Sequence, residues 1–204
     1  TRIAERLEAL EKATPADMAS VQMDDTDLFA KVLVPSLLAV PLEGPSGEAD
    51  QQDLLDFTED ARDLLRDWDH TTPAADSDSS AAAAYYNAVW RNLCELLFDD
   101  ELPADMKSDG GDSWRAAVQL LLKDPQSEWW DDKLTPNVTE GRDEILRQAL
   151  VQARLELTRE LGKDPASGKP VTVRMGRFGP FVQIGTKDDE EKPRFAGLRP
   201  GQKM

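Results

Sequence analysis

Residues 81–98, AAAAYYNAVWRNLCELLF, decide the fold class of this chain of 204 residues. Their large apolar side chains recur at intervals of three and four, the spacing that places them on one face of an α-helix: Tyr85, Tyr86, Val89, Trp90, Leu93, Cys94, Leu97 and Phe98. The serines and aspartates of 76–80 are suitable N-caps. This stretch therefore predicts the strongest amphipathic helix of the chain.

Segments on both sides of residues 81–98 show the same period. Gly162 is expected to end the last helix, with Leu157 and Leu161 on its buried face, and residues 137–139 to cap its start. The segment 28–42 is expected to be buried and kinked, because Pro35 interrupts it. The other expected helices cover 2–12, a segment that begins near Pro15, 54–68, 114–122 and 139–162. The chain is predicted to be mainly α.

The period changes after Gly162. Val171, Val173 and Met175 alternate with other residues, and residues 181–184 form a second short apolar run after Gly179 and Pro180. Alternation is typical of strands, so a small C-terminal antiparallel β-hairpin is expected. The sequence thus predicts two parts, a helical region over 1–162 and a β region over 163–204.

The sign of the net charge also changes near residue 163. The whole chain carries a net charge of −16, but residues 163–204 hold nine basic and five acidic side chains, so this tail is +4 and the remainder is −20. A strongly acidic surface repels nucleic acid and anionic membranes. Any nucleic-acid binding is therefore expected in the tail.

Cysteine and histidine are scarce, with Cys94 and His70 as the only ones. No intrachain disulfide can form, a zinc site is not expected, and no cofactor is predicted. The sequence has no run of 18 apolar residues, so no membrane partner is expected. Because the chain begins with Thr1, we also expect that an upstream part is missing.

Several residues admit a functional and a structural interpretation. Calcium binding and solvated charges are the alternatives for the acidic clusters, but none has EF-hand spacing. Cys94 is either a nucleophile or a core residue, and the core is favoured because it shares a face with Trp90 and Phe98. Trp129 and Trp130 either gate a ligand or anchor a loop. The role as loop anchors is favoured. The clusters are 24–27, 99–101, 109–112 and 131–132.

The order of several motifs over roughly residues 2–165 resembles the later β-chain of the penicillin acylase (penicillin amidase) family of N-terminal nucleophile hydrolases. The motifs are TPADM at 14–18, LLRDWD at 64–69, AAAAYYNAVWRNL at 81–93, FDDEL at 98–102, SEWWDDKLTP at 127–136 and TEGRDEILRQALVQARLELTRELG at 139–162. The resemblance implies the helical portion of an αββα fold and hydrolysis of a linear amide, such as a penicillin or an acyl-homoserine lactone.

Enzymes of that family use the hydroxyl of a serine that opens the β-chain, with its own α-amino group as base. That serine, the oxyanion asparagine and the calcium ligands lie upstream of the matched motifs, so no catalytic residue is assigned to this chain. The family's arginine near the substrate would fall just before Thr1, and Arg2 is its nearest substitute. We expect the chain alone to be inactive, because it can act on an amide substrate only together with the missing part.

Residues 161–204 resemble a C-terminal repeat of bacterial type IA DNA topoisomerases. The motifs are DPASGKPVTV at 164–173, RMGRFGPFVQ at 174–183 and KPRFAGL at 192–198. Such repeats bind single-stranded DNA, which suits aromatic rings that stack on bases and cations that follow phosphates. The residues expected to bind DNA are Arg174, Arg177, Phe178, Phe181 and Phe195, although Phe181 is also a candidate for the hairpin core.

The string LGKDP at 161–165 fits both families, which favours a chimera joined near residue 163. The acylase resemblance implies a periplasmic or secreted protein and the topoisomerase resemblance a cytoplasmic one, so localisation stays open. Hydrolase fragment and DNA-binding module are the two alternatives for function.

Overall fold

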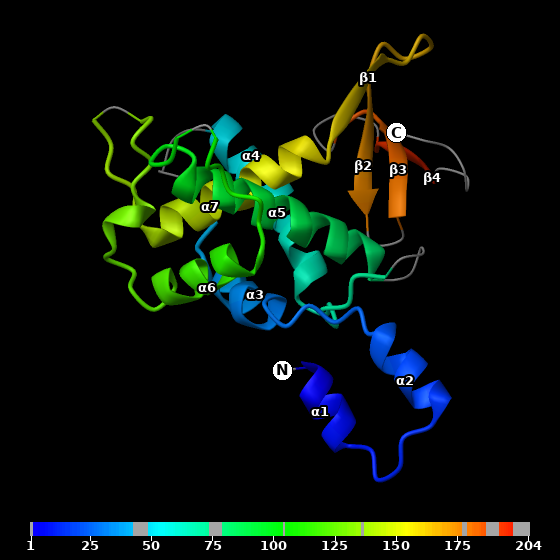
Figure 1. Ribbon diagram of the computed structural model, residues 1–204. Coiled ribbons are helices and arrows are strands. Elements are labelled where there is room, and N and C mark those ends of the chain that lie inside the picture. The colour runs from blue at the N-terminus through cyan, green and yellow to red at the C-terminus, as the bar shows by residue number, and fades with distance from the viewer. Residues whose placement is uncertain are drawn as a thin grey trace.

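The computed structural model describes residues 2–42, 49–73, 79–103, 105–135, 137–176, 179–186 and 192–197, with only the backbone described at 49–53, 159–162, 174–176, 179–180 and 197. Helices form the body of the molecule and a small antiparallel sheet lies at one end of it (Figure 1). The predicted fold class, mainly α with a small C-terminal antiparallel β unit, is confirmed.

Helix α5 (Ser80–Phe98) is the centre of the helical body. The apolar face predicted from the sequence is buried, from Tyr85 and Tyr86 at one end to Leu97 and Phe98 at the other. The small side chains of 81–83 are also buried, which lets neighbouring segments approach the first turns closely. Nearly the whole circumference of α5 is therefore core.

Helix α7 (Arg142–Glu156) packs against both α5 and α4 (Ala49–Arg62). The Tyr85 hydroxyl donates a hydrogen bond to the Leu150 carbonyl of α7 over 3.0 Å. On the other side, the buried Arg154 donates to the Phe57 carbonyl over 3.2 Å and stacks its guanidinium on the Phe57 ring. Hydrogen bonds from buried polar side chains thus join α7 to both α4 and α5.

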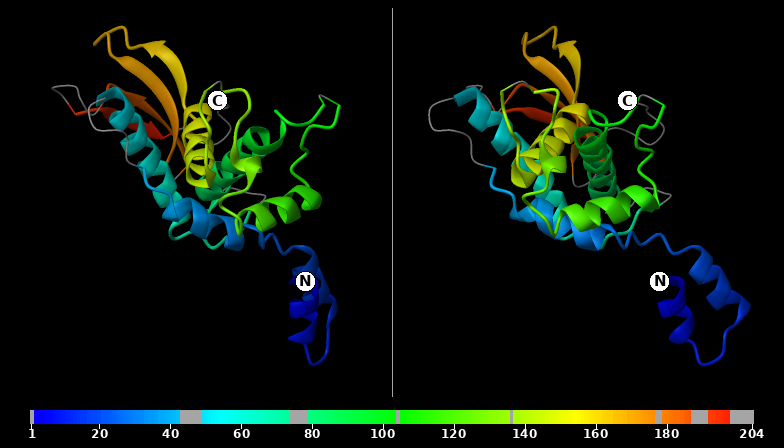
Figure 2. Two further views of the ribbon diagram at one scale, coloured as in Figure 1. Left: turned by 90° about the vertical axis from the view of Figure 1, so that its left-hand side faces the viewer. Right: turned by 60° about the vertical axis from the view of Figure 1, so that its left-hand side comes forward.

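Two further helices cover the base of this body. Helix α3 (Ala30–Ala39) has Pro35 inside it and buries Leu33, Val34 and Leu37, and helix α6 (Asp112–Leu121) buries Val118. In Figures 1 and 2 α3 and α6 lie side by side. The segment predicted to be buried and kinked is therefore a helix with an internal proline.

Helices α1 (Arg2–Glu8) and α2 (Pro15–Gln22) form an arm that projects from the body (Figure 2). Neither buries a residue. Helix α2 begins at Pro15, as predicted, and Thr14 and Asp17 form a capping box at its start. Ion pairs from Arg2 and Arg6 to Asp24 fasten α1 to the chain that follows α2.

The C-terminal unit is a four-stranded antiparallel sheet in the order β1-β2-β3-β4. Strands β2 (Pro170–Gly176) and β3 (Gly179–Ile184) are the predicted hairpin, paired from Val171 opposite Ile184 to Gly176 opposite Gly179. Strand β1 (Arg159–Lys163) extends the hairpin on one side and β4 (Arg194–Gly197) on the other. The sheet contacts the body where β3 meets α5.

The prediction that the last helix reaches Gly162 is wrong. Helix α7 ends at Glu156, and residues 159–163 are strand β1, with Arg159 opposite Val173 of β2. Residues 157–161 have good helix propensity, but pairing with β2 satisfies the backbone groups of 159–163 and adds a fourth strand to the sheet. Leu161 is therefore in a strand.

The predicted cap of this helix is also wrong. Helix α7 begins at Arg142 after the extended Gly141, which makes no side-chain capping bond. Asn137 instead adopts a left-handed conformation with φ of 66°, which asparagine tolerates better than most residues. Residues 137–141 are thus a loop that precedes the helix.

Replacement of Leu93 by alanine tests whether α5 is the centre of the core. Leu93 is fully buried, so Leu93→Ala should lower the free energy of unfolding by about 2–5 kcal/mol, the usual cost of lost burial plus a cavity. Urea denaturation followed by circular dichroism measures it. The matched control is Leu120→Ala on α6, where 67% of the side chain is exposed and a change below about 0.5 kcal/mol is expected. Equal effects of the two substitutions would contradict this assignment.

Candidate functional site

One face of the sheet carries three of the five residues predicted to bind DNA. Arg174 of β2 is the register partner of Phe181 of β3, and Phe195 of β4 is opposite Gln183 of β3. Directly paired residues and residues two apart in a strand share a face. Arg174, Phe181 and Phe195 are therefore positions on the same face.

The two phenylalanines of this face contact each other. Their ring centroids are 5.8 Å apart and the rings meet edge to face. Phe195 is 63% exposed, whereas Phe181 is half-buried. Phe181 thus serves the packing of the sheet, as one of the two interpretations held, while Phe195 presents a ring to solvent. Arg177 and Phe178 lie outside the described residues.

A group of basic residues that we did not predict as site residues surrounds a small crevice at one end of the sheet. The crevice has a volume of about 20 Å³, and its lining residues are Asp164, Ser167, Lys169, Ile184, Lys192 and Arg194. They come from the β1–β2 turn, the end of β3 and the start of β4. The excess of basic residues in the tail was a sequence signal for this group. Its position could not be predicted, because only the folded sheet brings the β1–β2 turn next to β3 and β4.

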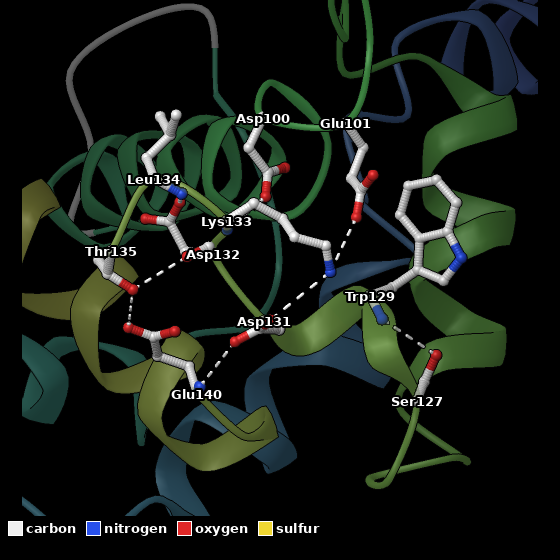
Figure 3. A network of polar contacts seen from close by, with 10 residues as sticks. All are labelled: Asp100, Glu101, Ser127, Trp129, Asp131, Asp132, Lys133, Leu134, Thr135 and Glu140. Atoms are coloured by element: carbon white, nitrogen blue, oxygen red, sulfur yellow. Dashed lines mark hydrogen bonds and ion pairs between the residues drawn. The ribbon is translucent and has the colours of Figure 1, made fainter. Parts of the chain in front are cut away.

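The segment 127–140 is held by a network of polar contacts (Figure 3). Asp131 accepts a hydrogen bond from the Glu140 backbone over 3.1 Å and pairs with Lys133 at 3.5 Å. The backbone of Lys133 donates to Asp100 over 2.8 Å, and Thr135 donates to the buried Glu140 over 2.6 Å. The acids of this segment therefore shape a loop.

Trp129 and Trp130 anchor a loop, which was the interpretation favoured from the sequence. Trp130 is fully buried and its indole donates to the Asp124 carbonyl over 2.9 Å. Trp129 contacts the ring of Phe98 on α5 at a centroid distance of 5.8 Å. Both tryptophans anchor the loop on the core.

The other acidic clusters also have structural partners. Asp24 binds the guanidinium of Arg6, which lowers the pKa of this carboxyl far below its usual range, with help from Thr26 and Arg2. Asp27 accepts hydrogen bonds from the backbone of Phe29 and Ala30 at the start of α3. Within the described residues, no three His, Cys, Asp or Glu side chains are grouped as a metal site would require.

Cys94 and His70 lie in structural positions. Cys94 is buried in the core, and burial raises the pKa of its thiol to about 11. His70 has a left-handed backbone with φ of 63° and its ring lies against Trp68 at 5.3 Å. A thiol held neutral by burial is a poor nucleophile.

Arg2, the residue nearest to the position where the sequence analysis expected a substrate arginine, lines an open hollow. The hollow has a volume of about 540 Å³ and is bounded by α3, α6 and the start of α1. The Nε atom of Arg2 donates to Asp24 over 2.9 Å. No sequence pattern had singled out this hollow, because its walls come from three separate helices.

Within the part of the chain that the structure describes, no helix has both the length and the apolar character to cross a membrane.

A family model described as penicillin amidase matches residues 1–184. The match covers the helical body and continues through β3, past the junction predicted near residue 163. The division into residues 1–162 and 163–204 stays a prediction.

The chain is also similar to bacterial topoisomerases over a short stretch. It is 72% identical over 46 residues to DNA topoisomerase 1 of Xylella fastidiosa, a match that covers 22% of this chain and 6% of that protein. It is 67% identical over 27 residues to DNA topoisomerase 1 of Mycobacterium tuberculosis, which covers 13% of this chain and 3% of that protein. Both resemblances predicted from the sequence are confirmed. The family match and the Xylella match together exceed the chain length, so they share residues, as the ambiguous string LGKDP indicated.

The buried position of Cys94 predicts how its thiol reacts. Because its pKa is raised to about 11, the folded protein should react with a thiol-specific disulfide reagent at pH 8 at least about 100-fold more slowly than free cysteine. In guanidinium chloride the reaction should become complete and fast. Absorbance of the released thiolate measures both rates. A fast reaction of the folded protein would contradict the placement of Cys94.

Proposed function

The chain belongs to the penicillin amidase family, and from that premise we propose that it is a non-catalytic helical part of an enzyme that hydrolyses a linear amide. A penicillin or an acyl-homoserine lactone is the proposed type of substrate. The observation that carries the proposal is the family match over residues 1–184, which includes every helix of the body.

The chemistry of the described residues supports a non-catalytic role. Amide hydrolysis by a nucleophile needs an accessible nucleophile, a base within hydrogen-bond reach and donors for the oxyanion. The side chains best suited to the first two tasks hold structural positions, Cys94 in the core and His70 against Trp68. In the complete enzyme, the role of this part is then to support and shape the substrate site.

A second candidate function is binding of single-stranded DNA through the sheet. It is favoured by the solvent-exposed ring of Phe195 beside Phe181, by the position of Arg174 on the same face and by the likeness to topoisomerases. Bases stack on exposed rings and cations follow the phosphates. The acidic body opposes this attraction, so binding should be strongest at low salt.

Hydrolysis of a chromogenic phenylacetamide tests the first proposal. The purified chain should release no product above the rate of buffer alone, because the nucleophile of the reaction lies elsewhere in the enzyme. Absorbance at the chromophore measures release. Product formation that follows protein concentration, and that persists in Cys94→Ala, would place a nucleophile in this chain and reject a non-catalytic role.

Fluorescence polarisation of a labelled single-stranded oligonucleotide tests the second proposal. Binding is expected at low salt, and Phe195→Ala should weaken it about ten-fold, since one stacked base contributes about 1–3 kcal/mol. Because Phe195 is an exposed residue of an edge strand, the substitution should leave the fold intact. Leu120→Ala, equally exposed but on α6, is the control and should bind as the unaltered chain does. Absence of binding, or equal binding by both variants, would reject DNA recognition by this face.

A further inference from the structure

The hollow between α3 and α6 has the size of a ligand site. Its volume of about 540 Å³ is within the range of roughly 300–1,000 Å³ that small-molecule pockets occupy. It is open to solvent on the side of the arm, where Arg2 reaches it. Its other lining residues are Thr26, Asp27, Leu28, Phe29, Val32, Asp112, Arg115, Ala116 and Gln119.

Arg115 has hydrogen-bonding capacity that the described residues leave unused. Its Nε atom is buried and has no hydrogen-bond partner among the described residues. Its two terminal nitrogens are 3.5 Å from Asp27 and 3.8 Å from Asp112, which are ion-pair distances longer than a hydrogen bond. Because Nε is buried, an acceptor in the hollow would meet the guanidinium at its terminal nitrogens, whose ion pairs are long and leave room for a hydrogen bond.

The two aspartates differ in how firmly they are held. Asp27 accepts backbone hydrogen bonds at the start of α3, at 2.8 Å from Phe29 and 3.1 Å from Ala30, so it is fixed and orients Arg115. Asp112 is fully exposed, and exposed ion pairs are weak. An incoming carboxylate can therefore take the place of Asp112 while Asp27 stays.

Apolar side chains at the start of α3 also line the hollow. Phe29 is buried against Trp90, with ring centroids 5.0 Å apart, and Val32 is half-buried on the next turn of α3. Leu28 is more exposed and lies at the rim. A ligand that fits this hollow combines an acceptor head for Arg115 with an apolar body for α3.

We propose that the hollow between α3 and α6 binds a small organic carboxylate, with its head on Arg115 and its apolar body against Phe29 and Val32. Arg2 of α1 also lines the hollow, but its guanidinium is already paired with Asp24. The site is remote in sequence from the sheet and needs no catalytic residue, so it stands independently of both functions proposed above.

Isothermal titration with benzoate tests this site in the full chain. Benzoate should bind with saturation at one site per chain, whereas benzyl alcohol, which has the same ring without the charge, and acetate, which has the charge without the ring, should each bind at least about ten-fold more weakly. Failure of benzoate to saturate, or equal affinity for benzyl alcohol, would overturn the proposal.

Three variants locate the binding. Arg115→Gln should weaken benzoate binding at least about ten-fold because it removes the charged donor, and Arg142→Gln, which changes a half-buried arginine outside the hollow, should have no effect. Asp112→Asn should tighten binding about two- to five-fold because it removes the competing carboxylate. This gain cannot arise from a folding defect. Unchanged affinity in both Arg115→Gln and Asp112→Asn would overturn the proposal.

Discussion

The packing of α5 against α7 is the interaction on which the rest of the structure depends. Tyr85 reaches the backbone of α7 at one end, and Arg91 and Asn92 both bind Glu156 at the other. Helix α4 rests on α7, α3 contacts α7 as well, and β1 follows α7 in the chain. Because α5 buries nearly its full circumference, no neighbour can be displaced without exposing part of the core.

The acidic surplus of the helical part is used largely for local structure. Aspartates cap α2 and α3, fasten the arm to the body and hold the loop that precedes α7. A carboxylate that accepts two or more hydrogen bonds at a helix start fixes the chain there. Other acids, such as Glu59 and Glu144, pair with an arginine three residues further along the same helix.

The sequence predicted what depends on local pattern and missed what depends on distant contact. Residues 81–98 repeat with a helical period, and the helix has the expected face. Residues 157–163 have the same helical character, yet their pairing with β2 outweighs it. The register that brings Phe181 and Phe195 together was only half predictable, because β4 adds to the hairpin from beyond a loop. Similarly, Arg115, Asp27 and Phe29 line one hollow although α6 and α3 are far apart in sequence.

The connection between α7 and β1, which joins the two parts of the chain, is very short. Only Leu157 and Thr158 separate the helix from the strand, and both still donate backbone hydrogen bonds into the last turn of α7, at 3.1 Å each. The Thr158 hydroxyl adds a third bond, to the Arg154 carbonyl. Two residues held by these hydrogen bonds cannot act as a hinge, because their backbone dihedral angles are restricted. The sheet is therefore attached to the helical body at two places, this short connection to α7 and the contact between β3 and α5, which together restrict how far it can turn relative to the helices.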